Sequence, residues 1–105
     1  MTEFIKVAQT RDLPPGTTLV VEYDDFDEVG LVHLPDDGIY AISNVCTHDD
    51  GPLFEGKLEG ECMICPRHGA KFNVKSGDYT LPAFAPVPRF QVKIEGDDIL
   101  IAPVE

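Results

Sequence analysis

Two pairs of metal-binding side chains stand out in the chain. Cys46 and His48 are two positions apart, Cys65 and His68 are three apart, and sixteen residues separate the pairs. Thiolate sulfur suits iron–sulfur clusters, zinc and Cu(I), whereas imidazole nitrogen suits zinc, copper and iron. Each pair can offer one sulfur and one nitrogen to a shared centre. The residue types and their spacing therefore predict a metal site built from two short loops.

Glycine and proline frame both pairs. Gly51-Pro52 follows the first pair, and Pro66 and Gly69 stand on either side of the second histidine. Because proline fixes turns and glycine permits close backbone approach, both pairs are expected on tight loops. A structural zinc site is the alternative, but zinc-binding pairs usually leave about two to four residues between ligands. The one-residue gap inside the first pair is tight for zinc.

The motifs resemble those of Rieske-type [2Fe–2S] proteins. The matching segments are Cys46-x-His48, Gly51-Pro52-Leu53, Cys65-x-x-His68-Gly69, the strand and turn Phe72–Gly77, and the proline-bearing Leu81-Pro82-Ala83. The resemblance covers nearly the whole chain. It implies an all-β, Rieske-like fold, in which an antiparallel β-sandwich base carries a small inserted cluster-binding subdomain at about 45–84.

The resemblance also implies a ligand set, because in Rieske proteins two histidines replace two cysteines on one of the two irons. Cys46 and Cys65 would hold the inner iron of a single [2Fe–2S] cluster. His48 and His68 would hold the outer iron near the surface. A cluster with protein ligands at every iron position has no open site for a substrate, so its task is one-electron transfer. We therefore expect an electron-transport protein, a ferredoxin, and not an enzyme.

By the same resemblance, the protein partners are a flavin-dependent reductase as donor and a terminal oxygenase, or a similar acceptor, as recipient. Two alternatives stay open: a small redox subunit fixed in a larger reductase such as nitrite reductase, and a structural zinc module. The sequence shows no Ser/His/Asp set, phosphate-binding glycine loop or paired catalytic carboxylates. It therefore predicts no small-molecule substrate.

Four positions bear on the reduction potential through the resemblance. Gly51 and Arg67 stand where respiratory Rieske proteins carry two further cysteines joined by a disulfide, so that bridge is expected to be absent. Ala70 and Phe72 stand where high-potential members place a serine and a tyrosine hydroxyl, and neither side chain can donate. We expect a potential near the low end of the Rieske range, on the order of −150 mV. It should fall at alkaline pH, where the histidine ligands lose protons.

Length and charge bound the remaining possibilities. The chain has 105 residues, which suits one domain (1–105), and 43% of them are hydrophobic. The net charge of −11, from 19 acidic and eight basic residues, makes nucleic acid and anionic membranes poor partners. No apolar run approaches the roughly 18 to 20 residues that cross a bilayer, and the first residues do not resemble a signal peptide. A soluble, cytoplasmic protein is expected.

Charged residues near the pairs suggest how partners approach. Asp49 and Asp50 follow the first pair and could steer a basic surface of a partner toward the site, although a plain loop role is the alternative. Arg67, Lys71 and Lys75 gather three of the eight basic residues around the second pair. The sequence therefore predicts a docking face of mixed charge.

The rest of the chain reads as short strands separated by turns. β-Branched and aromatic residues, alternation with polar residues, and Gly/Pro/Asp turns predict strands at 4–7, 17–23, 29–34, 39–43, 62–64, 70–74, 90–94 and 99–102. Turns are predicted at 12–16, 35–38, 59–61, 75–78 and 95–98, and an irregular loop at 81–88. Apolar residues do not recur at helical spacing over three turns. Cys62 is predicted to be a buried structural thiol, and His33 a structural or surface histidine.

Overall fold

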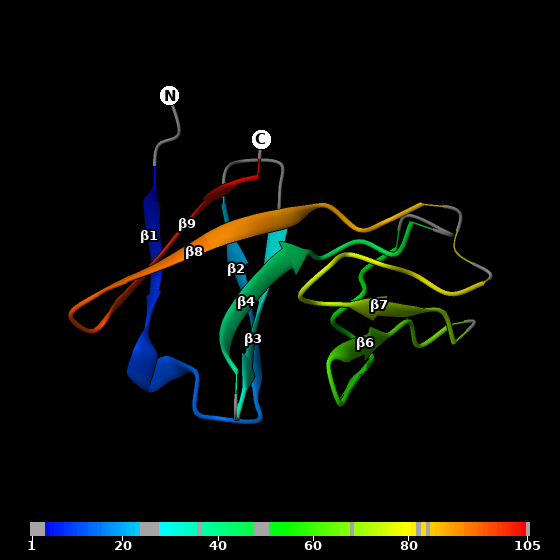
Figure 1. The fold of residues 1–105 in the computed structure, drawn as a ribbon, viewed down its shortest axis with the longest axis horizontal. Helices are drawn as coiled ribbons and strands as arrows, with labels where there is room; N and C mark the ends of the chain where they lie inside the picture. Colours follow the sequence, from blue (N-terminus) through cyan, green and yellow to red (C-terminus); the bar gives the residue numbers. More distant parts are fainter. Residues whose placement is uncertain are drawn as a thin grey trace.

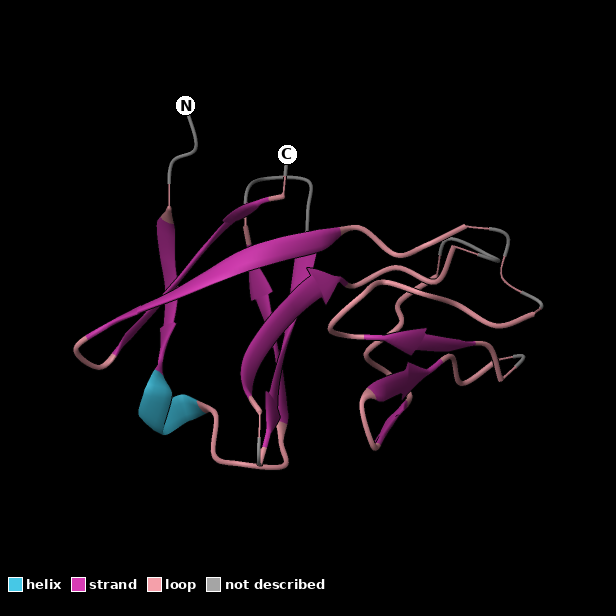
Figure 2. Ribbon diagram, viewed as in Figure 1, coloured by secondary structure: helices cyan, strands magenta, loops and turns pink. Residues whose placement is uncertain are grey.

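The computed structural model describes most of the chain. The described residues are 4–23, 28–35, 37–47, 51–67, 69–81, 83 and 85–104. They form nine β-strands and one short 3-10 helix, in two antiparallel sheets (Figures 1 and 2). The predicted all-β fold is confirmed.

A six-stranded antiparallel sheet makes the base of the molecule, with the strand order β1-β9-β8-β4-β3-β2. Its strands are β1 Ile5–Gln9, β2 Thr18–Glu22, β3 Glu28–Leu34, β4 Gly38–Ser43, β8 Arg89–Glu95 and β9 Asp98–Pro103. The predicted turn at 35–38 joins β3 to β4, where Gly38 has a φ of 93° that favours glycine. Because β4 pairs with β8, the chain between them leaves the sheet and returns to it.

The excursion between β4 and β8 carries a second, three-stranded sheet, which lies beside the base in Figure 1. Its strands are β5 Lys57–Glu59, β6 Cys62–Ile64 and β7 Lys71–Asn73. All three fall within the range 45–84 expected for a cluster-binding subdomain. The division into base and subdomain stays a prediction.

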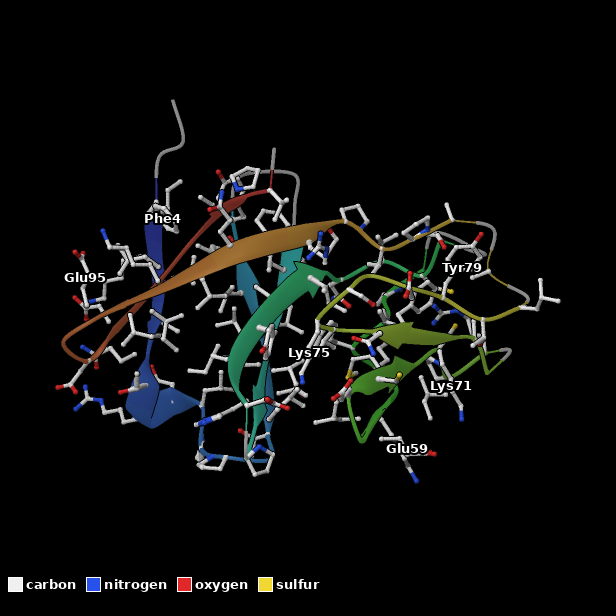
Figure 3. All side chains as sticks on the ribbon, viewed as in Figure 1. Phe4, Glu59, Lys71, Lys75, Tyr79 and Glu95 are labelled. Carbon is white, nitrogen blue, oxygen red and sulfur yellow. The ribbon has the colours of Figure 1, made fainter. Side chains whose placement is uncertain are left out.

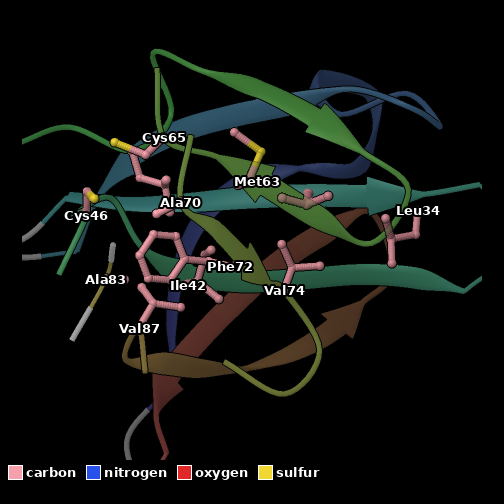
Figure 4. Close-up of a cluster of buried hydrophobic side chains, with 12 residues drawn as sticks. Leu34, Ile42, Cys46, Met63, Cys65, Ala70, Phe72, Val74, Ala83 and Val87 are labelled. Carbon is pink, nitrogen blue, oxygen red and sulfur yellow. The ribbon is translucent and has the colours of Figure 1, made fainter. Parts of the chain in front are cut away.

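Strand β3 separates two apolar cores because alternate residues of a strand face opposite sides. Val29 and Leu31 belong to a core closed by β9, and Val32 and Leu34 belong to a second core. The second core contains Met63, Phe72 and Val74 of the small sheet and its turn, as well as residues of the base (Figure 4). Shared burial of side chains therefore holds the small sheet against the base.

Two local elements differ from the sequence predictions. Strand β5 was not predicted, because only Leu58 among its three residues is apolar. Residues Thr10–Asp12 form a 3-10 helix (η1), so the turn predicted at 12–16 begins one residue too early. Leu13, at the start of that predicted turn, is fully buried. The other predicted strands are present, with ends that differ by one or two residues.

Candidate metal centre

The first loop of the candidate centre follows strand β4. The amide of Cys46 donates to the Gly51 carbonyl at 2.8 Å, which closes the loop on itself. The Cys46 side chain is fully buried. Thr47, the next residue, donates its hydroxyl to the Ala85 carbonyl at 2.6 Å. The loop is thus fixed at both of these residues.

The second loop joins β6 to β7. The Cys65 amide donates to the Ala70 carbonyl at 2.8 Å, and the Gly69 amide donates back to the Cys65 carbonyl at 3.0 Å. Gly69 has a φ of 76°, a conformation that side chains other than glycine disfavour. Cys65 is 1% exposed. A tight hairpin therefore holds this cysteine in the interior.

The two loops bring their cysteines together. Figure 4 shows Cys46 and Cys65 at the same edge of the second core, and both belong to one buried cluster with Ala70 and Phe72. No disulfide involves any of the three cysteines, all of which lie in the described part of the chain. Two thiols at one edge of an apolar core fit a group that takes thiolate ligands.

The other two candidate ligands, His48 and His68, lie outside the described residues, as do Asp49 and Asp50. The complete set of four ligands and the steering role of the two aspartates therefore stay predictions.

Arg67 ties the two loops to each other. Its guanidinium donates to the Pro52 carbonyl at 3.1 Å and lies 3.6 Å from the Glu55 carboxylate. A Cβ atom added to Gly51 would lie 2.8 Å from this guanidinium. The two positions at which the resemblance places an extra disulfide in respiratory proteins are therefore in close proximity here. In place of a disulfide, the Arg67 side chain packs over Gly51 and connects the two loops.

The basic residues of this region pair with carboxylates of the same chain. Besides Arg67, Lys71 lies 4.0 Å from Glu59, and Lys75 lies 2.6 Å from Asp37 and 3.0 Å from Glu61. The hydrogen bonds and charge of the carboxylates raise the pKa of Lys75, and the Lys75 ammonium lowers the pKa of Glu61. These cations pair with carboxylates of the same chain, and the mixed docking face stays a prediction.

Cys62 and His33 have structural surroundings. The prediction of a buried thiol at Cys62 is wrong in degree, because the residue is only half-buried. This partial burial raises the pKa of its thiol. A thiol with a raised pKa is a poorer nucleophile and metal ligand at neutral pH. His33 Nδ1 donates to the Leu13 carbonyl at 2.8 Å, which confirms a structural histidine.

A hollow of about 440 Å³ adjoins the second loop. Its walls include Cys65, Pro66 and Gly69 of the loop, and Glu55 and Lys57 from the chain before and within β5. The second loop therefore borders a concave surface on one side and contributes Cys65 to the core.

Two threonines that sequence reasoning missed support these loops. Thr47 bonds to Ala85 as described, and the Thr80 hydroxyl accepts from the Lys71 amide at 2.9 Å. The bonds span 38 and nine residues. No periodicity or spacing rule predicts a side-chain bond between distant loops, although the position of Thr47 between two candidate ligands was a signal.

Comparison with known proteins identifies this arrangement. The family model for the Rieske [2Fe-2S] domain matches residues 3–91. The chain belongs to the Rieske [2Fe–2S] family. It is 38% identical to the ferredoxin component of biphenyl 2,3-dioxygenase of Rhodococcus jostii, over 91% of this chain and 89% of that one.

Solved structures agree. A chain from a complex of reduced oxygenase and oxidized ferredoxin in carbazole 1,9a-dioxygenase has a TM-score of 0.86 and 31% identity, with 94% of this chain and 92% of that chain covered. A putative NADH-dependent nitrite reductase small subunit from Mycobacterium tuberculosis has a TM-score of 0.84 over 100% of this chain and 98% of that chain. At 22% identity the second likeness shows the shared fold alone.

The protein is thus a Rieske-type ferredoxin, an electron carrier and not itself a catalyst, and its cofactor is a [2Fe–2S] cluster. This assignment removes the zinc alternative. Within the described residues, no helix has the length and apolar character needed to cross a membrane.

Proposed function

We propose that Cys46, His48, Cys65 and His68 hold the [2Fe–2S] cluster. The observation that supports this most is the burial of Cys46 and Cys65 at one edge of a single core. Each of these cysteines precedes one of the two histidines by two or three residues. When bound, the cluster supplies reversible one-electron chemistry.

The chain's own contribution is to fix and enclose the ligands. The bonds from the Cys46 and Cys65 amides close each loop on itself. The apolar neighbours Ala70 and Phe72 keep water away from the buried thiols. Hydrogen-bonded loops and an apolar surround are features by which a protein tunes a cluster, since hydrogen bonding and solvent access set its reduction potential.

We further propose that the protein carries electrons from a flavin-dependent reductase to the oxygenase of an aromatic-ring dioxygenase system. The relative from Rhodococcus jostii is the ferredoxin component of such a dioxygenase, and the carbazole dioxygenase structure is a complex of ferredoxin with oxygenase. These two proteins align with 91% and 94% of this chain at 38% and 31% identity, which supports the same role here.

The test is a reconstituted electron-transfer assay with the cluster-loaded protein. A ferredoxin reductase and NADH should reduce it in a stopped-flow experiment, and the reduced protein should then reoxidise on mixing with a resting dioxygenase oxygenase. If the protein is reduced quickly but passes no electrons to any ring-hydroxylating oxygenase, it is still an electron carrier, but the proposed acceptor is wrong. Permanent co-purification with a large reductase would instead favour a fixed subunit.

A further inference from the structure

The loop that contains the first two candidate ligands is bonded to a distant part of the chain. The Thr47 hydroxyl donates to the Ala85 carbonyl at 2.6 Å, a short bond between residues 38 positions apart. Thr47 lies directly between Cys46 and His48 in the sequence. The bond made by its side chain therefore restrains the chain at the position between these two candidate ligands.

Ala85 belongs to the proline segment, which is defined here as residues 79–81, 83 and 85–88. This segment has one side in the core, where Ala83 is 1% exposed, and another in solvent, where Leu81 is 84% exposed. It has the position of a cover over the cysteine-bearing edge of the second core, because Ala83 and Val87 belong to the same buried cluster as the two cysteines (Figure 4).

The proline segment has anchors at both ends. The Thr80 hydroxyl and amide bond to the Lys71 amide and carbonyl at 2.9 and 3.0 Å. The Val87 amide donates to the Gly77 carbonyl at 3.2 Å. These anchors lead to β7 and the turn after it. The Thr47 hydroxyl adds the bond that leads to the first ligand loop.

We propose that Thr47 is a positioning residue, whose hydroxyl holds the proline segment against the first ligand loop and so sets the environment of the cluster. The inference rests on the proposed ligand set. The net contribution of one neutral O–H···O bond is small, enough to decide between two positions of a loop but not to decide the fold. The consequence should therefore appear in the properties of the cluster more than in stability.

Three variants test this proposal. Thr47→Val keeps the shape of the side chain and removes the donor, whereas Thr47→Ser keeps the donor and removes the methyl group. Thr17→Val is the matched control, because the Thr17 hydroxyl also donates to a carbonyl, that of Pro14, at 2.6 Å, and belongs to the base of the molecule. Each variant is loaded with its cluster, and the EPR g values and midpoint potential are measured beside iron and sulfide content.

Thr47→Val should show shifted g values and a higher midpoint potential. Release of the cover admits water, which stabilises the negative charge that reduction adds. Thr47→Ser and Thr17→Val should match the wild type. A Thr47→Val protein that loses its cluster while Thr47→Ser keeps it supports the proposal too, since the donor is then needed for assembly.

Unchanged g values and potential in Thr47→Val would overturn the proposal. So would an equal shift or an equal loss of cluster in Thr47→Ser, because the hydroxyl would then not be the cause. A wild-type protein that assembles no iron–sulfur cluster would overturn the proposed ligand set and this inference with it, and that outcome is distinguishable because it needs no variant.

Discussion

The Lys75 ammonium lies 2.6 Å from the Asp37 carboxylate, and this ion pair joins the small sheet to the base. Asp37 is in the turn between β3 and β4, and Lys75 follows β7. The same ammonium lies 3.0 Å from Glu61, in the turn between β5 and β6, and 6.0 Å from the centre of the Tyr40 ring (Figure 3). One lysine thus contacts both sheets of the molecule.

Replacement of Lys75 by methionine should loosen the contact between the sheets. Methionine preserves the apolar stem and removes the charge, so Asp37 and Glu61 are left close together without their cation. We expect a modest fall in Tm by calorimetry and faster hydrogen exchange in β5–β7 than in β3 and β4. Lys93→Met is the matched control, since Lys93 pairs with Glu95 of its own strand. Equal effects of the two variants would contradict the role given to Lys75.

The pKa of Glu61 predicts a dependence of stability on pH. Its hydrogen bond with Lys75 lowers this pKa below the ordinary value of 4.5. A carboxyl group whose pKa is lower in the folded chain stabilises the fold above its unfolded pKa, and this stability is lost as the pH falls through the folded pKa. Denaturant titrations should therefore show a shallower loss of stability below about pH 4.5 in Glu61→Gln than in the wild type. In a Lys75→Met background, the Glu61→Gln change should alter this acid limb less, because of the two hydrogen bonds that lower the pKa of Glu61 only the one from Asn73 is then left. An unaltered acid limb in the single variant would refute the coupling.

Gly30 of β3 lies under the Phe54 ring, and an added Cβ would be 2.0 Å from two ring atoms. Gly30→Ala should displace the ring and destabilise the protein by about 1 to 3 kcal/mol, a typical cost of overpacking. Phe54→Ala in the same chain should relieve part of this cost, so the double variant should be more stable than the sum predicts. Gly56→Ala is the contrast, because its Cβ would meet the Ile64 backbone carbonyl, which truncating Phe54 cannot relieve. If the changes in unfolding free energy of Gly30→Ala and Phe54→Ala simply add in the double variant, the Phe54 ring is not what limits the space at Gly30.

Ala70 and Phe72 predict a low reduction potential. Both are fully buried in the cluster of side chains that holds the two cysteines, and neither can donate a hydrogen bond. The midpoint should lie near the low end of the Rieske range, on the order of −150 mV. Ala70→Ser should raise it, because a hydroxyl donor stabilises the more negative reduced state. Ala41→Ser, at a buried alanine of the core that contains no cysteine, is the control. A wild-type midpoint above about +100 mV in protein-film voltammetry would contradict the account.

Much of this fold could be predicted from local sequence, and the reasons are visible in particular residues. Strand β8 and the turn at 35–38 between β3 and β4 could be predicted, because alternation of apolar and polar residues and turn-forming residues are local patterns. Strand β5 could not, since Lys57 and Glu59 flank a single apolar residue and the strand forms by pairing with β6. Pairing between segments is a tertiary effect that composition does not record.

The site divides in the same way. The spacing of the cysteines and histidines identified both loops, and the structure brings Cys46 and Cys65 together as the sequence led us to expect. The partners of Lys75 could not be foreseen, because Asp37 is far from it in sequence and charge pairs depend on the completed fold.

Cys46, His48, Cys65 and His68 are proposed to hold a [2Fe–2S] cluster. The most direct test is the EPR spectrum of the dithionite-reduced protein, with iron and acid-labile sulfide content, for wild type, Cys46→Ser and Cys62→Ser. We expect a rhombic signal of low average g and about two irons per chain in wild type and Cys62→Ser, and no such signal in Cys46→Ser. A wild-type protein that contains zinc without sulfide, or a Cys46→Ser protein with an unchanged signal, would contradict this proposal.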